Sequence, residues 1–173
     1  MAWEIDTTHS HVNFAVKHMM FSTVRGKFKV FSGKLNIDEQ NPANSWVEAE
    51  ADAASVDTNE PNRDNHLRSG DFFDVETFPT FTFKSTSVEK NGDGYKVAGD
   101  LTIHGVTKPV VFDAEYLGQG KNPWGLTVAG LSATTKIRRS EFGLNYNAAL
   151  EAGGVLVGDE VKIELDLETI NKD

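Results

Sequence analysis

The sequence contains no cysteine, and this absence excludes three kinds of chemistry at once. A chain without cysteine forms no disulfides, offers zinc no thiolate ligands and has no cysteine nucleophile. It also lacks any apolar run approaching the roughly 18 residues that suggest a membrane-spanning helix. The sequence therefore predicts a chain that does not span a membrane and that suits a reducing cytosol.

Positive charge is also in short supply, with 17 lysines and arginines against 26 aspartates and glutamates. The formal net charge of -9 opposes long-range attraction to nucleic acid and to anionic lipid headgroups, so no nucleic-acid partner is expected. Only three tyrosines accompany eleven phenylalanines. Because phenylalanine has no polar group, most of the aromatic surface suits a dry interior.

The length of 173 residues fits one domain spanning residues 1–173, which buries roughly two-thirds of its unfolded surface. The first residues, Met1 to Asp6, are strand-like, with no basic region followed by an apolar run. A cytoplasmic location is expected from this pattern, and a periplasmic one if a leader has been removed.

Apolar and polar residues alternate along almost the whole chain. Val12, Phe14 and Val16, for example, fall on one face of a run, and Lys17 falls on the other. Alternation with a period of two is typical of half-buried strands. Roughly eight strands are expected, and the main alternating runs cover residues 12–17, 24–30, 33–37, 47–53, 95–103, 110–116, 126–133 and 161–167.

Two glycine-containing turns, at Asn91 to Gly94 and at His104 to Gly105, separate alternating runs. Glycine admits the positive φ of tight hairpins, so the neighbouring strands are expected to pair antiparallel. Residues 86–94 and 118–123 are predicted to be loops. Short strands, one or two short helices and no repeated βα pattern predict an all-β fold, either a barrel or a sandwich.

A short helix is expected just before the middle of the chain. Thr58 or Asn59 can cap it, Pro61 suits its first turn and Gly70 can end it. After Pro79, alternation places Phe81 and Phe83 on one face of a strand. The sequence thus passes from a charged helix to an aromatic wall.

Small residues recur on the faces that are predicted to point inward. They are Gly26, Gly33, Ala49, Ala51, Ala53, Gly99 and Ala114. About eight strands closed on themselves enclose either a packed core or space for one small ligand. Large residues such as Phe28 and Phe112 can interdigitate with the small ones at normal interior density. The pattern alone leaves a packed core and a ligand cavity equally open.

Eight segments spread over nearly the whole chain resemble the YceI-like polyisoprenoid-binding family. They are Trp3–Asp6, His9–Ser10, Phe14–His18, Gly26–Phe28, Arg63–Phe83, Gly99–Pro109, Arg139–Gly143 and Gly158–Val161. The resemblance implies an extended, lipocalin-like antiparallel β-barrel whose tunnel holds a long isoprenoid or similar chain, often in a homodimer. Ligands of the family range from prenyl quinones and prenyl phosphates to fatty acyl derivatives, so the resemblance does not determine the headgroup of the ligand.

With this resemblance, inward-facing apolar residues become the predicted tunnel lining. They are Phe14, Val16, Phe28, Val30, Leu35, Ile37, Ala49, Ala51, Phe72, Phe73, Phe78, Phe81, Phe83, Val97, Leu101, Ile103, Phe112, Phe142, Ile163 and Leu165. Arg63, Asp64, His66 and Arg68 precede the aromatic wall and are the candidate headgroup ligands, since they could reach a quinone oxygen or a phosphate. The alternative is that they belong to a capped, salt-bridged helix that closes the barrel end.

Other polar residues give weaker signals. His9 and His11 share a strand face, but no third ligand lies at recognisable spacing and Ser10 has no evident base, so neither a metal site nor a catalytic triad is expected. Residues 136–139 form a small basic cluster that could contact a phosphate, but they are interpreted as solvated strand cations. The apolar triplet at 19–21 suits a lid, a core segment or a dimer contact.

The predicted function is non-enzymatic sequestration or transport of a long-chain isoprenoid lipid, with no cofactor. One alternative is an enzyme acting on such a lipid, with Asp64 and His66 as an acid-base pair. Another is a stress-response scaffold with a packed interior. A carrier needs an interior cavity and a packed scaffold has none, so the volume of the cavity distinguishes these two alternatives.

Overall fold

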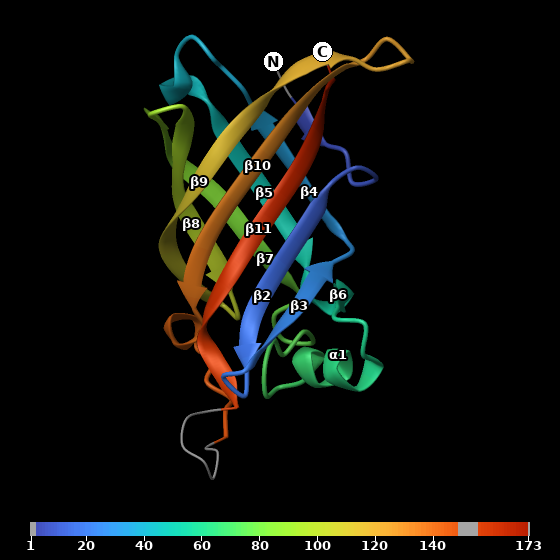
Figure 1. Ribbon diagram of the computed structural model, residues 1–173, viewed down its shortest axis with the longest axis vertical. Helices are drawn as coiled ribbons and strands as arrows, with labels where there is room; N and C mark the ends of the chain where they lie inside the picture. The colour runs from blue at the N-terminus through green and yellow to red at the C-terminus, as the bar shows by residue number, and fades with distance from the viewer. Residues whose placement is uncertain (1–2, 149–155, 173) are drawn as a thin grey trace.

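The computed structural model describes residues 3–148 and 156–172, which fold around one antiparallel sheet (Figure 1). Its strands are β1 (Trp3–Ile5), β2 (His11–His18), β3 (Ser22–Phe28), β4 (Phe31–Asn36), β5 (Trp46–Asp52), β6 (Val56–Asp57), β7 (Thr80–Asn91), β8 (Gly94–Ile103), β9 (Val106–Lys121), β10 (Thr127–Arg138) and β11 (Val157–Asn171). The helical segments are α1 (Pro61–Arg68) and the short 3-10 helices η1 (Pro42–Asn44), η2 (Ala53–Ser55) and η3 (Arg139–Phe142).

The sheet closes into a barrel because the long strand β11 has two partners along one edge. Near its end β11 pairs with β1, with Trp3 opposite Asn171, and near its start it pairs with β2, with Val161 opposite Val16. In the described residues, the order β1-β4-β5-β7-β8-β9-β10-β11 therefore returns to β1 and closes eight strands. The prediction of an all-β, antiparallel barrel of about eight strands is confirmed.

Helix α1 lies at one end of the barrel, below β3 and β6 in Figure 1. Its N-cap is Glu60, whose carboxylate accepts hydrogen bonds from the backbone N–H groups of Asn62 (3.3 Å) and Arg63 (2.8 Å). The prediction of Thr58 or Asn59 as the cap is wrong, because Thr58 is buried and bonded to Asp64 instead. None of the helices within residues 3–148 and 156–172 is both long and apolar enough to cross a bilayer.

Two segments that were predicted as loops belong largely to strands. Strand β7 continues to Asn91 and β9 continues to Lys121, so only short turns remain. Their side chains are mostly polar and exposed, which concealed the strands from a search for apolar alternation, although Val88 is buried. The two glycine-containing turns are confirmed, with positive φ at Gly92 (61°) and Gly105 (73°).

The small residues of the wall accommodate aromatic rings. A Cβ on Gly26 would overlap the ring of Phe14, which lies on the neighbouring strand. A Cβ on Gly99 would lie 2.5 Å from both the Phe83 ring and the carbonyl oxygen of Lys84. These glycines let the rings lie flat against the wall, so the space beside them is filled by phenylalanine.

We expect Gly99→Ala to lower the free energy of unfolding by about 1–3 kcal/mol, since the new methyl group must displace a backbone carbonyl as well as a ring. Urea denaturation measures this loss. Gly120→Ala is the matched control, because Gly120 also lies in a strand and a Cβ there meets nothing within 4 Å. Equal losses in the two variants would contradict the proposed overlap.

Candidate ligand-binding tunnel

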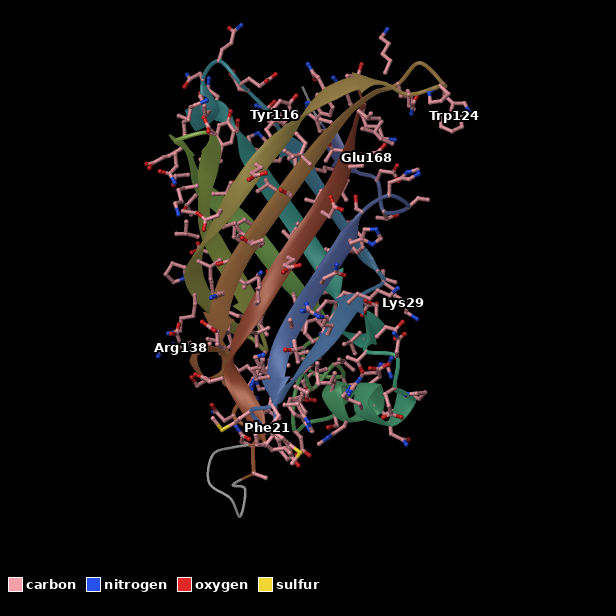
Figure 2. The ribbon with its side chains drawn as sticks, viewed as in Figure 1. Phe21, Lys29, Tyr116, Trp124, Arg138 and Glu168 are labelled. Atoms are coloured by element: carbon pink, nitrogen blue, oxygen red, sulfur yellow. The ribbon has the colours of Figure 1, made fainter. Side chains whose placement is uncertain are left out.

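A cavity of about 330 Å³ lies inside the barrel, and apolar side chains make up most of its wall. Its lining extends from Leu67 and Phe72, at the α1 end, to Asp38 and Ser45, in the connection between β4 and β5. The two ends of the barrel are far apart, as the positions of Tyr116 and Phe21 show in Figure 2. A cavity of this size falls within the range of pockets that hold small ligands.

All but three of the predicted tunnel residues line this cavity. Those that do are Phe14, Val16, Phe28, Leu35, Ile37, Ala49, Ala51, Phe72, Phe73, Phe81, Phe83, Val97, Leu101, Ile103, Phe112, Ile163 and Leu165. They come from strands throughout the barrel and from the segment after α1. The structure brings them together, and their contact with a ligand stays a prediction.

The other three lie elsewhere. Val30 is 57% exposed, because β3 ends and β4 begins on either side of it and the alternation is interrupted there. Phe142 is 1% exposed and packs in the core, outside the cavity lining. The ring of Phe78 packs against His104, with centroids 4.7 Å apart, beside the turn at Gly105.

The α1 end of the cavity is aromatic. The ring of Phe28 lies 5.5 Å from Phe14, 6.0 Å from Phe73 and 5.2 Å from Phe81, measured between centroids. Phe73 and Phe81 also meet edge to face at 5.1 Å. Such tilted and edge-to-face pairs are favourable geometries for phenyl rings, so this end offers a preformed apolar surface.

Two of the candidate headgroup residues hold the start of α1 in place. Asp64 is buried and accepts hydrogen bonds from the backbone N–H (2.9 Å) and the hydroxyl (2.6 Å) of Thr58. Arg63 donates from Nε to the Thr58 hydroxyl and from Nη2 to the Thr58 carbonyl, both at 2.7 Å. Neither Arg63 nor Asp64 lines the cavity.

The other two candidates, His66 and Arg68, hold the end of the helix. Nε2 of His66 lies 2.9 Å from a carboxylate oxygen of Asp71. Arg68 donates to the carbonyls of Ala54 (2.8 Å) and Val56 (3.2 Å), and it does not line the cavity. These contacts fasten α1 to the barrel, which favours the alternative of a helix that closes the barrel end.

Arg139 is a buried cation in the cavity lining and was not among the predicted site residues. It donates from Nε to the carbonyl of Gly158 (2.9 Å), from Nη1 to those of Leu144 (2.9 Å) and Tyr146 (3.2 Å), and from Nη2 to that of Val157 (3.3 Å). Burial lowers the pKa of its guanidinium, and the charge of Asp159 opposes this shift. The interpretation of residues 136–139 as solvated cations is therefore wrong at this position.

Polar groups gather at the opposite end of the cavity. Its lining there includes Asn36, Asp38, Glu39, Ser45 and Tyr116. Alternation could have identified Tyr116, because it continues the predicted inward face of residues 110–116. The acidic residues lie in the connection after β4, where strand periodicity gives no information.

A second polar cluster, made of Asp6, His9 and Glu168, lies near the start of β2. One potential ligand atom from each residue lies within 4.8 Å of the others. Nδ1 of His9 is 2.8 Å from a carboxylate oxygen of Asp6, and this hydrogen bond raises the pKa of His9 and lowers that of Asp6. Ser10 exchanges hydrogen bonds with the backbone of Glu168. These polar contacts account for the cluster as a surface ion pair.

A closed antiparallel barrel with an apolar cavity and a helix at one end defines a lipocalin-like architecture. Residues 3–169 match the YceI-like domain, and the chain belongs to this family. A UPF0312 protein of Vibrio parahaemolyticus is 45% identical over 171 residues, which cover 97% of this chain and 86% of the relative. Protein YceI of Escherichia coli O157:H7 is 46% identical over 136 residues, covering 79% of this chain and 71% of the relative.

Solved structures show the same fold. BcnA of Burkholderia cenocepacia is 27% identical with a TM-score of 0.84, covering 95% of this chain and 98% of that one. The YceI protein of Campylobacter jejuni is 32% identical with a TM-score of 0.77, covering 91% and 90%. A polyisoprenoid binding domain from Saccharophagus degradans shares the fold at 17% identity, with a TM-score of 0.68 and 97% coverage of both chains. The resemblance predicted from sequence motifs is confirmed.

Proposed function

We propose that the protein is a non-enzymatic carrier or store that holds one long-chain isoprenoid or similar lipid inside its barrel. The observation that carries this proposal is the apolar cavity of about 330 Å³. The Saccharophagus degradans domain is described as polyisoprenoid-binding, which supports the choice of ligand class. Prenyl quinones and prenyl phosphates are the candidates within that class.

Burial of the chain supplies the driving force in this proposal. Each buried methylene is worth about 0.8 kcal/mol, so several isoprene units yield roughly 10 kcal/mol or more before the cost of immobilising the chain. The aromatic cluster around Phe28 adds preformed contact surface at one end. Few polar contacts are therefore needed for useful affinity.

The positions of Asp64 and His66 argue against the enzyme alternative. Asp64 is bonded to Thr58 and His66 to Asp71, and neither residue lines the cavity. An acid-base pair must reach the reacting atoms of its substrate. The cavity itself argues against a scaffold with a packed interior.

Extraction of the natively expressed protein with organic solvent, followed by mass spectrometry, tests the proposal. We expect close to one equivalent of a long-chain lipid per barrel. Protein stripped of lipid should also take up an added prenyl lipid at the same stoichiometry. Failure of both measurements would contradict the carrier function.

Transport between particular membranes or proteins, a cytoplasmic location, a homodimer and the lack of a nucleic-acid partner stay predictions. The exposed triplet Met19 (41%), Met20 (64%) and Phe21 (88%) supports an intermolecular contact at the α1 end. Exposed apolar side chains that lie together often mark such contacts.

A further inference from the structure

We infer that the lipid enters with its head at the β4–β5 end of the tunnel, where the Tyr116 hydroxyl donates a hydrogen bond to an uncharged carbonyl on the head. The inference rests on the proposed function and deepens it by naming the class of head. A quinone, an amide or an ester has the required acceptor, whereas a prenyl phosphate carries negative charge that this end disfavours.

Tyr116 provides the first argument. It lies on β9, lines the cavity, and has an enclosed hydroxyl oxygen with no normal hydrogen-bond partner in the described part of the chain. A buried hydroxyl without a partner loses its hydration and gains nothing in return. A ligand carbonyl inside the tunnel would supply an acceptor at normal geometry, in competition with the carboxylate of Glu39.

The charges around Tyr116 determine whether its hydroxyl acts as a hydrogen-bond donor. Burial raises the pKa of its hydroxyl, and the carboxylate of Glu39 raises it further, both through its charge and as an acceptor that lies outside normal hydrogen-bond geometry. The hydroxyl therefore stays protonated at neutral pH and acts as a donor. Its ligand partner must be an acceptor with a lone pair, such as a carbonyl oxygen.

Two carboxylates make this end unfavourable for an anionic head. Asp38 and Glu39 both line the cavity here. Asp38 accepts hydrogen bonds from the backbone N–H groups of Asn41 (2.9 Å) and Gln40 (3.1 Å), and the bond from Asn41 contributes most to lowering its pKa. Asp38 is thus a fixed negative charge, and like charges repel more strongly where water is partly excluded.

Three arginines, Arg63, Arg68 and Arg139, are poorly placed to compensate a phosphate at this end. Arg139 is the basic residue in the cavity lining, and its donors already meet four backbone carbonyls at the other end. Arg63 and Arg68 are engaged by carbonyls around α1, away from the cavity. The aromatic cluster at that end suits the tail of the lipid, which orients the ligand.

Three probes of equal isoprene number test the inference: a prenyl quinone, a prenyl diphosphate and an isoprenoid hydrocarbon without a head. Displacement of the uncharged dye N-phenylnaphthylamine gives their relative affinities. We expect the quinone to bind about tenfold more tightly than the hydrocarbon, because one buried donor gains its acceptor. The diphosphate is expected to bind more weakly than the quinone.

Tyr116→Phe removes only the hydroxyl and should weaken quinone binding about tenfold while leaving the hydrocarbon unchanged. Tyr146→Phe is the matched control, because the Tyr146 ring packs between His66 and Phe72 and is outside the cavity lining. Glu39→Gln should strengthen binding of the diphosphate, because it removes one of the two carboxylates that line this end of the cavity.

The outcomes separate this inference from the proposed function. Binding of all three probes with equal affinity, or a preference for the diphosphate, overturns the inference and leaves a lipid carrier. Equal losses of quinone binding in the two tyrosine variants also overturn it. If no probe binds, both proposals fail. The preference of the unmodified protein decides the matter even if a variant does not fold.

Discussion

Ala133→Trp is expected to weaken lipid binding by about three orders of magnitude while leaving the barrel folded. Ala133 lines the cavity from β10 and lies directly opposite Ala114 of β9, so two small side chains meet there. An indole at this point would occupy the path of the chain. Displacing one isoprene unit of five carbons removes roughly 4 kcal/mol, which is about a thousandfold in affinity.

The barrel should tolerate this change because the new side chain enters a cavity and not a close-packed core. Thr134→Trp is the matched control, since Thr134 is the next residue on β10, is exposed and does not line the cavity. Titration with a prenyl lipid, together with thermal denaturation, distinguishes a blocked tunnel from an unfolded protein. Undiminished binding in Ala133→Trp would place the ligand outside this cavity.

The regular strands could be predicted because alternation reports directly which side chains face the interior. Leu101 and Ile103 on β8, for example, were placed on the inward face by a period of two alone, and both line the cavity. The signal fails where the chain changes direction, as at Val30, which is exposed between two buried phenylalanines. It also fails for polar strand ends such as residues 86–91, whose backbone is paired although their side chains show little periodicity.

The polar groups were harder to predict, because a charged side chain can pack against acceptors that are far away in sequence. Arg68 reaches the carbonyls of Ala54 and Val56, which lie 14 and 12 residues earlier in the chain, in η2 and β6. The clustering of charged residues beside aromatic ones therefore suggested headgroup ligands. In the structure these charged residues instead hold α1 in place. The lack of a partner for Tyr116 is likewise a property of the folded chain alone.

The chemical difference between the two ends of the tunnel results from which polar side chains have hydrogen-bond partners. At the α1 end, Arg63, Arg68 and Asp64 are occupied by backbone groups or by Thr58, and the rings around Phe28 form an aromatic surface. At the β4–β5 end, one hydroxyl lacks a partner and two carboxylates line the wall. In the arrangement that we propose, the tail of the lipid is bound through buried apolar area and the head through a single hydrogen-bond donor.

Arg139→Leu is expected to lower the free energy of unfolding by about 3–5 kcal/mol, because it leaves one buried and three partly buried carbonyls without this donor. Arg139 joins the chain after η3, through Leu144 and Tyr146, to the start of β11, through Val157 and Gly158. Although burial lowers its pKa, arginine normally titrates so far above neutrality that the guanidinium remains charged. Each of its bonds is therefore a charge-assisted one.

The preceding residue, which ends β10, gives the control for this loss. Arg138 is exposed, so Arg138→Leu should change the free energy of unfolding by less than about 0.5 kcal/mol. Arg139→Lys should fall between the two, because a compact ammonium cannot reach four carbonyls that a planar guanidinium spans. Urea denaturation of the three variants measures this order. Equal stability of Arg139→Leu and Arg138→Leu would mean that water replaces the guanidinium at no cost, and the cation would then have no structural role at this end of the tunnel.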